Sequence, residues 1–220
     1  MRDVPEPSRR EIARYLGYHG EEPDAQVREA IERCLSQLME QCRPKEVHRT
    51  FDLTVGEDGL LSFGGCSWMS RNLAKNLENC GKVVLFAATI GQAPDRLIRR
   101  ASVEKVSDMV IYQAASAAMI EAWCDRLNLQ IKEDAEKEGL YVRPRFSPGY
   151  GDLSLTVQSD VIRLLDTPRA IGVTLTESCL MAPSKSVTAV IGLSKEERPC
   201  PLSGCEMCSM TDCPYRRNSA

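Results

Sequence analysis

The chain has 220 residues, of which 43% are hydrophobic and 27% are charged, so it is long and apolar enough to bury a sizeable core. This composition excludes a disordered tail and a fibre. Lys and Arg total 28 against 31 for Asp and Glu, a formal charge of −3, and no run of five like charges occurs. Neither nucleic acid nor an anionic membrane surface is therefore expected as a partner.

The pattern of apolar residues also bears on location. The first twenty residues contain no apolar segment of the kind that signal peptides carry, and no stretch approaches the roughly 18 apolar residues of a membrane span. We therefore expect a cytoplasmic protein. In that setting the ten cysteines favour thiolates for metal or redox chemistry over a disulfide framework.

The first 43 residues predict two helices. Ser8 with Glu11 three residues later has the pattern of a capping box, and predicts a short helix to about Leu16. A second helix is expected to begin at Pro23 or Asp24, to pack one apolar stripe on the core, and to end before Pro44.

The next forty residues predict mainly strands. Residues 47–55 alternate apolar and polar side chains, a glycine-containing turn follows, and residues 60–63 return, which predicts a hairpin. Ser70 is expected to cap a short helix that stops near Gly81. The continuous apolar run at 83–87 is too short for a helix and predicts a buried central strand.

Helices and strands are also predicted in the second half of the chain. Helical composition is clearest over residues 105–137 and returns over 156–166. Residues 171–176 and 187–193 predict two strands around the turn at Ala182-Pro183. With no internal repeat and no Gly/Ser linker, the economical interpretation is one α+β domain over residues 1–198, followed by a small cysteine-rich tail at 199–220.

Several common sites are not indicated. The sequence has neither G-x-G-x-x-G nor G-x-x-x-x-G-K-[ST], so no dinucleotide fold or phosphate loop is signalled. The two histidines, His19 and His48, have no further histidine at ligand spacing, so each is interpreted as structural. Histidine-based catalysis is not expected.

Glu121 is a first candidate site residue. At helical spacing it shares a face with apolar and small residues, including Ala114 and Ala117, where a carboxylate needs a partner or a ligand. Small side chains there allow another element or a ligand to approach the backbone closely. The structural alternative is a surface glutamate that turns into solvent or pairs with Arg126.

A second candidate is the segment R-F-S-P-G-Y-G-D, residues 145–152, within a stretch at 141–152 that follows a possible helix-ending Gly139. Its prolines restrict the backbone and its glycines permit positive φ, so this specialised loop, which is not expected to be a strand, can present main-chain groups to a planar heterocycle. Arg145 can bind a carboxylate and Tyr150 can cover a ring. The alternative is a rigid loop that fills a gap in the core.

The third candidate is the cysteine cluster of the tail. Its four cysteines have the spacing C-x4-C-x2-C-x4-C and can surround one [4Fe–4S] cluster or one Zn²⁺ ion; they are Cys200, Cys205, Cys208 and Cys213. Disulfides or free thiols are the alternative. The other six cysteines are scattered, and we expect most of them to be small buried apolar residues.

Taken together, three segments resemble the reactivation domain of cobalamin-dependent methionine synthase: the loop motif R-F-S-P-G-Y-G-D, the later L-T-E-S at 175–178 and M-A-P-S-K-S-V at 181–187. They resemble the stand-alone members of that family more than the fused C-terminal domain. The resemblance is strongest over residues 121–193. It implies a C-shaped α+β domain with a twisted antiparallel sheet flanked by helices, which binds S-adenosylmethionine in an extended pose.

The resemblance also implies roles for single residues. Arg145 matches the arginine that binds the methionine carboxylate, and Ser147, Gly149 and Tyr150 match the loop that contacts the adenosine. Glu121 matches a helix glutamate near the amino group of the ligand.

The function implied is reactivation of a corrinoid enzyme that has fallen to Co(II), by an electron and a methyl group from S-adenosylmethionine. Because the chain has no Asp-x-His-x-x-Gly motif, the cobalamin is expected on a partner, either methionine synthase or another corrinoid protein. An electron donor such as flavodoxin or ferredoxin is a further expected partner. The chain would then be an accessory subunit of a methyltransferase.

Two other functions remain open from the sequence. One is a non-catalytic docking or sensing module for a corrinoid protein, with a structural metal in its tail. The other is an iron–sulfur electron-transfer protein, which would leave Arg145 and Tyr150 without a role.

Overall fold

The fold is taken from a computed structural model, which describes residues 6–18 and 20–197. Two helices come first, and the predicted cap of the first one is confirmed. They are α1 (Arg9–Tyr15) and α2 (Ala25–Gln41). The Ser8 hydroxyl accepts a hydrogen bond from the Glu11 backbone N–H, and the Asp24 carboxylate accepts one from Val27. These side chains satisfy donors that the first turn of a helix leaves without partners.

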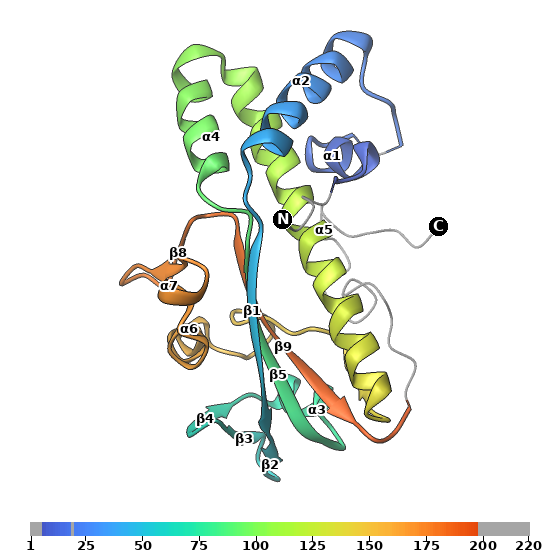
Figure 1. The fold of residues 1–220 in the computed structure, drawn as a ribbon, viewed down its shortest axis with the longest axis vertical. Coiled ribbons are helices and arrows are strands. Elements are labelled where there is room, and N and C mark those ends of the chain that lie inside the picture. Colours follow the sequence, from blue (N-terminus) through green and yellow to red (C-terminus); the bar gives the residue numbers. More distant parts are fainter. Residues whose placement is uncertain (1–5, 19, 198–220) are drawn as a thin grey trace.

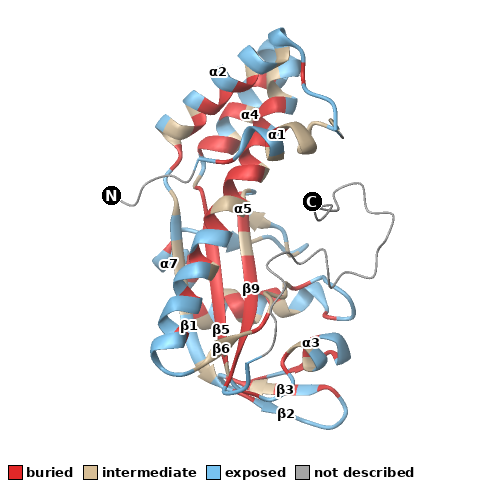
Figure 2. Cartoon of the chain, turned by 90° about the vertical axis from the view of Figure 1, so that its right-hand side faces the viewer, coloured by how far each residue is buried: buried red, intermediate tan, exposed pale blue. Residues whose placement is uncertain are grey.

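The main sheet has four antiparallel strands in the order β1-β5-β9-β6. Its strands are β1 (Lys45–Asp52), β5 (Cys80–Thr89), β6 (Tyr141–Val142) and β9 (Ser186–Ser194). The predicted central strand is confirmed, since β5 pairs with β1 on one side and with β9 on the other. Figure 2 shows that buried residues run along most of β5 and β9.

A small sheet lies at one end of the long strands, in the order β2-β3-β4. It consists of β2 (Thr54–Val55), β3 (Leu60–Phe63) and β4 (Cys66–Met69), and is followed by helix α3 (Arg71–Asn76). The predicted hairpin is confirmed for β2 and β3 only, because β1 pairs along its full length with β5. Alternation marks a half-buried strand but does not name its partner. β4 was not predicted.

Two helices complete the other end, where α4 (Ala93–Glu104) and the first part of α5 (Val106–Lys137) pack together with α1 and α2. Figure 1 shows α5 running from this helical end along the long strands toward the small sheet. The buried alanines of α5 belong to the larger apolar core, so its small residues mainly allow close packing.

The last part of the chain covers the opposite side of the sheet. It contains the 3₁₀ turn η1 (Leu155–Val157), α6 (Gln158–Leu165), α7 (Thr167–Ala170), β7 (Thr174–Leu175) and β8 (Met181–Ala182). A second apolar core lies beneath these elements. The strand predicted at 171–176 is only two residues long and pairs with β8 rather than with β9.

The expected α+β class with antiparallel sheets and flanking helices is confirmed. Of the six cysteines outside the tail, five are buried as predicted, and Cys179 is partly exposed. The tail at 199–220, with Cys200, Cys205, Cys208 and Cys213, lies outside the described residues, as does His19.

Candidate functional site

The loop between β6 and α6 is connected through β6 to the end of α5, and its backbone forms hydrogen bonds with β9. Gly139, with φ of +69°, follows α5 and lets the chain turn back, after which β6 pairs with the last residues of β9. Phe146 continues this pairing by exchanging two backbone hydrogen bonds with Val190, of 2.9 and 2.8 Å. The prediction that residues 141–152 contain no strand is therefore wrong for the first two, because the edge of β9 offers unpaired backbone groups.

This arrangement brings Arg145 onto Glu121 of α5. The Arg145 Nη2 atom lies 2.5 Å from Glu121 Oε2 and 3.4 Å from Asp125 Oδ1. The Arg145 side chain is 22% exposed and that of Glu121 30% exposed, so water screens the pair only partly. Burial is the largest single effect on the pKa of Arg145 and lowers it, but the charge and hydrogen bond of Glu121, together with Cys124 and Asp125, outweigh burial, so the net shift is upward.

The Arg145 guanidinium keeps one donor unused. Its Nη1 atom is buried and has no hydrogen-bond partner among the described residues. Because a buried donor without a partner costs free energy, this atom indicates a place for a further acceptor. The ion pair therefore places an acidic and a basic group side by side, and Arg145 Nη1 can still donate a hydrogen bond to a ligand.

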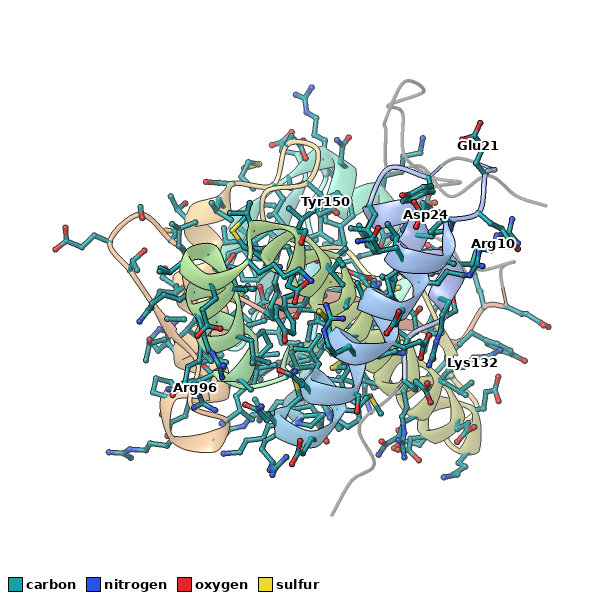
Figure 3. The ribbon with its side chains drawn as sticks, turned by 90° about the horizontal axis from the view of Figure 1, so that it is seen from above. Arg10, Glu21, Asp24, Arg96, Lys132 and Tyr150 are labelled. Atoms are coloured by element: carbon teal, nitrogen blue, oxygen red, sulfur yellow. The ribbon has the colours of Figure 1, made fainter. Side chains whose placement is uncertain are left out.

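The rest of the loop forms tight turns that hold Tyr150 at the surface. The Tyr150 N–H donates to the Ser147 carbonyl at 3.2 Å, and the Gly149 N–H to the Leu153 carbonyl at 3.0 Å. Gly149 has φ of +88°, a conformation that other residues rarely adopt. Tyr150, labelled in Figure 3, is 64% exposed, and its ring centroid lies 6.5 Å from that of Phe146. Such a ring is available to cover a flat ligand.

Asp152 anchors the far end of this loop, a role that sequence reasoning did not assign. Its carboxylate accepts hydrogen bonds from the Ser70 hydroxyl and from the backbone N–H groups of Arg71, at 2.8 Å, and Asn72, at 3.2 Å. The Ser70 hydrogen bond is the main reason why the pKa of Asp152 is lowered. Two features of the sequence could have suggested this contact: the predicted helix cap at Ser70, and the acidic residue at the end of the motif at 145–152.

The five predicted ligand residues thus fall on two neighbouring elements. Glu121 and Arg145 are in contact, and Ser147, Gly149 and Tyr150 share the loop that Arg145 begins. The alternative pairing of Glu121 with Arg126 is not what the structure shows, since the Arg126 guanidinium lies 5.8 Å from the Trp123 ring centroid. The loop also fills part of the core, because Leu153 is buried.

No group of three or more His, Cys, Asp or Glu side chains in residues 6–18 and 20–197 could hold a metal ion. Within the same residues, no helix is both long enough and apolar enough to cross a membrane. The four tail cysteines lie outside the described residues.

Comparison with known proteins bears on the fold and on the family of the chain. No curated protein matches the chain. Among solved structures, the crystal structure of the MetH reactivation domain bound to AdoHcy matches with a TM-score of 0.62 and 16% sequence identity, over 86% of this chain and 74% of that one. That likeness establishes the fold. The model of the family "Vitamin B12 dependent methionine synthase, activation domain" matches residues 74–199, more than half of the chain. The chain therefore belongs to the family of activation domains of vitamin B12-dependent methionine synthase.

Proposed function

We propose that this protein binds S-adenosylmethionine at the loop of residues 145–152 and α5, and takes part in reactivating a corrinoid protein. The observation that carries the proposal is the contact between Arg145 and Glu121, in which Arg145 Nη1 is buried and has no partner among the described residues. The ligand bears a carboxylate, an ammonium group and an adenine, and it needs a basic group, an acidic group and a flat contact close together.

Each residue then has a definite task. Arg145 binds the ligand carboxylate with its unused Nη1 donor while Glu121 takes the ammonium group. The Asp125 Oδ1 atom lies 3.4 Å from Arg145 Nη2, so this carboxylate keeps a negative charge beside the guanidinium when Glu121 turns to the ligand. Tyr150 covers the adenine, and the turn at Ser147 and Gly149 presents backbone groups to its edge. The sulfonium is left near dipoles rather than in a full ion pair.

In the reaction, a donor would supply one electron to Co(II) cobalamin on the partner, and S-adenosylmethionine would give up its methyl group by cleavage of the S–CH3 bond, which yields methylcobalamin and leaves S-adenosylhomocysteine. The chain itself contributes binding and orientation, since two reactants held in place react far faster than two in solution. The partner is a methionine synthase or another corrinoid protein, and the donor a flavodoxin or a ferredoxin. The setting proposed is the cytoplasm.

The tail completes the proposal. Cys200, Cys205, Cys208 and Cys213 hold a [4Fe–4S] cluster or a Zn²⁺ ion, with iron–sulfur favoured because the reaction is a reduction and because Pro214 follows the last cysteine. In this view residues 1–198 form the binding domain and residues 199–220 form a metal-bearing appendage.

Calorimetric titration of S-adenosylmethionine into anaerobically purified protein tests the binding step. Arg145→Ala is expected to weaken binding roughly 10- to 100-fold, and Glu121→Gln roughly 10-fold, because each loses a charged hydrogen bond. Glu104→Gln is the matched control, since Glu104 also pairs with an arginine but on α4. Wild-type protein that binds no S-adenosylmethionine, or variants that bind as well as wild type, would contradict the proposal.

The reactivation step has its own readout. Protein, S-adenosylmethionine, reductant and a Co(II)-loaded corrinoid partner are mixed without oxygen, and the methylcobalamin spectrum is expected to return. Arg145→Ala should slow this return at low S-adenosylmethionine and recover at high concentration. Binding without any effect on the corrinoid would favour the docking module instead.

A further inference from the structure

A pocket lies between α2, α4 and the first turns of α5. It has a volume of about 200 Å³ and shares no residue with the proposed ligand site. Figure 1 shows that these three helices pack together at the end of the molecule opposite the small sheet. Pockets for drug-sized ligands measure roughly 300–1,000 Å³, so this one fits a smaller molecule.

The buried part of the pocket lining is mostly apolar. Leu97 and Ala101, about one helical turn apart on α4, are 6% and 5% exposed. Tyr112 of α5 is also buried there, and its hydroxyl donates to Gln37 Oε1 at 2.8 Å. Burial raises the pKa of Tyr112 to about 12, so the phenol stays uncharged at neutral pH. An apolar group of a ligand is stabilised when it leaves water for such a surface.

Arg100 of α4 lines the same pocket and has donors to spare. Its Nε atom lies 2.9 Å from Glu104 Oε1 and 2.8 Å from Glu104 Oε2, and both side chains are exposed. Neither Nη1 nor Nη2 has a hydrogen-bond partner within residues 6–18 and 20–197. These two atoms form one edge of the planar guanidinium, which can donate two parallel hydrogen bonds to a carboxylate. Arg100 can therefore bind a carboxylate without losing its contact with Glu104.

The charges around the pocket also favour an anion. The Asp108 carboxylate accepts from Arg33 Nη2 at 3.0 Å and lies 3.1 Å from Lys105 Nζ. Burial raises the pKa of Asp108, but the hydrogen bonds from Lys105 and Arg33 outweigh burial, so the net shift is downward and the group is ionised at neutral pH. Three cations, those of Arg33, Arg100 and Lys105, thus face the two carboxylates of these ion pairs, which leaves a net charge of +1. One further carboxylate balances this excess.

We propose that this pocket binds a small carboxylate with a short apolar body. The carboxylate accepts from the Nη1–Nη2 edge of Arg100, and the apolar body lies on Leu97 and Ala101. Gln37 Oε1 has a second lone pair beside the one that Tyr112 uses, so it can accept from a ligand that also carries an ammonium group. Two sources share this chemistry, a simple carboxylic acid and an α-amino acid. The inference goes beyond the proposed function, because it concerns a different ligand at a different place.

Titration of 4-methylpentanoate into the full chain, followed by NMR spectroscopy, tests the pocket. Binding is expected to saturate, and Arg100→Gln is expected to weaken it roughly tenfold or more, because the ligand loses a pair of charged hydrogen bonds. Arg96→Gln is the matched control, since Arg96, labelled in Figure 3, is an exposed arginine of α4 that is not part of the pocket lining. Wild-type protein that binds no 4-methylpentanoate, or equal affinity in Arg100→Gln, would overturn the proposal.

A series of ligands tests the two halves of the contact separately. 4-Methylpentan-1-ol lacks the carboxylate and is expected to bind roughly tenfold more weakly than 4-methylpentanoate. Decanoate is longer than a pocket of about 200 Å³ accommodates, and is expected to bind no better. Affinity that rises steadily with chain length would show non-specific apolar contact and contradict the pocket. L-Leucine has the same body with an added ammonium group, so its affinity relative to 4-methylpentanoate identifies which of the two sources the pocket prefers.

A further variant separates this pocket from the ligand site of Arg145, which is also proposed to bind a carboxylate. Arg145→Ala is expected to leave the affinity for 4-methylpentanoate unchanged, because Arg145 is not part of the pocket lining. Loss of binding in Arg145→Ala, with binding retained in Arg100→Gln, would place the acid at the loop of residues 145–152 and overturn the inference.

Discussion

Arg143 and Arg145 are separated by one proline, yet their surroundings differ in charge. Arg145 is 22% exposed at its side chain and faces two carboxylates of α5, whereas Arg143 is buried beside β9 and its Nε–Nη2 edge has no partner among the described residues. The extended segment turns one arginine toward α5 and the other toward the end of β9. One short motif thus serves two places: a ligand site in which one guanidinium faces two carboxylates, and a buried guanidinium whose Nε and Nη2 atoms have no partner among the described residues.

The largest difference is expected between the two arginines when the same substitution is made at each of them. Arg145→Met leaves Glu121 and Asp125 close together without a cation, and is expected to lower the free energy of unfolding by about 2 kcal/mol. Arg143→Met removes a buried guanidinium that has no carboxylate partner among the described residues, and is expected to leave stability unchanged or to raise it. Urea unfolding followed by circular dichroism measures both, and equal losses would remove the distinction.

A second substitution tests the packing around Arg143 alone. Gly192→Ala forces a Cβ to within 2.7 Å of Cys80 Sγ and is expected to cost about 1–3 kcal/mol of stability. Gly81→Ala in β5 is the matched control, since a Cβ there meets nothing within 4 Å. S-adenosylmethionine affinity should stay unchanged in Gly192→Ala, and a parallel loss of affinity would mean that the two arginine sites are not independent.

The third prediction concerns alkaline pH at the Arg145 site. Burial raises the pKa of the Cys124 thiol to about 12, from an ordinary value of 9.0. The folded protein therefore binds this proton more tightly than the unfolded chain, so the contribution to stability is full below pH 9 and is lost as the pH rises toward 12.

Cys124→Ala should accordingly flatten the fall of the unfolding midpoint between pH 8 and 10.5. Cys42→Ala, at a second buried thiol with a pKa raised to about 12, is the companion variant at the residue that follows α2. If the unfolding midpoint falls as steeply with pH in both variants as in the wild type, other groups cause the loss of stability at alkaline pH.

The smallest expected effect is at Asp152, which holds the loop of residues 145–152 to Ser70. The pKa of Asp152 is lowered, mainly by the Ser70 hydrogen bond, so its contribution is present above its unfolded pKa near 3.8 and is lost as the pH falls through the lower folded value. Asp152→Asn should reduce the melting temperature slightly at pH 7 and have less effect near pH 3. Thermal unfolding at both pH values checks this, and an equal effect at both would exclude the charge as the cause.

Local signals in the sequence were enough for much of the secondary structure. The side chains of Ser8 and Ser70 each accept a hydrogen bond from the backbone N–H three residues ahead, as predicted, because a cap depends on neighbouring residues only. The apolar run at 83–87 marked β5 correctly, since a strand covered on both faces needs no alternation.

The sequence could not predict in the same way which strands pair with one another in the sheets. The alternation at 47–55 predicted a strand, but β1 pairs with β5 rather than with β3, and β7 pairs with β8 rather than with β9. Pairing depends on contacts between residues far apart in the chain, which no local pattern encodes.

The candidate site, too, could be predicted from the sequence only in part. The types of residue at 121 and 145–150 were sufficient to nominate a binding loop and a helix carboxylate, because their chemistry is local. Their contact across 24 residues, the anchoring of Asp152 at Ser70 and the burial of Arg143 beside Gly192 were decided only by the tertiary structure. The physical reason is that burial and charge pairing depend on what the folded chain places around a side chain, whereas caps and apolar periodicity depend on the next few residues.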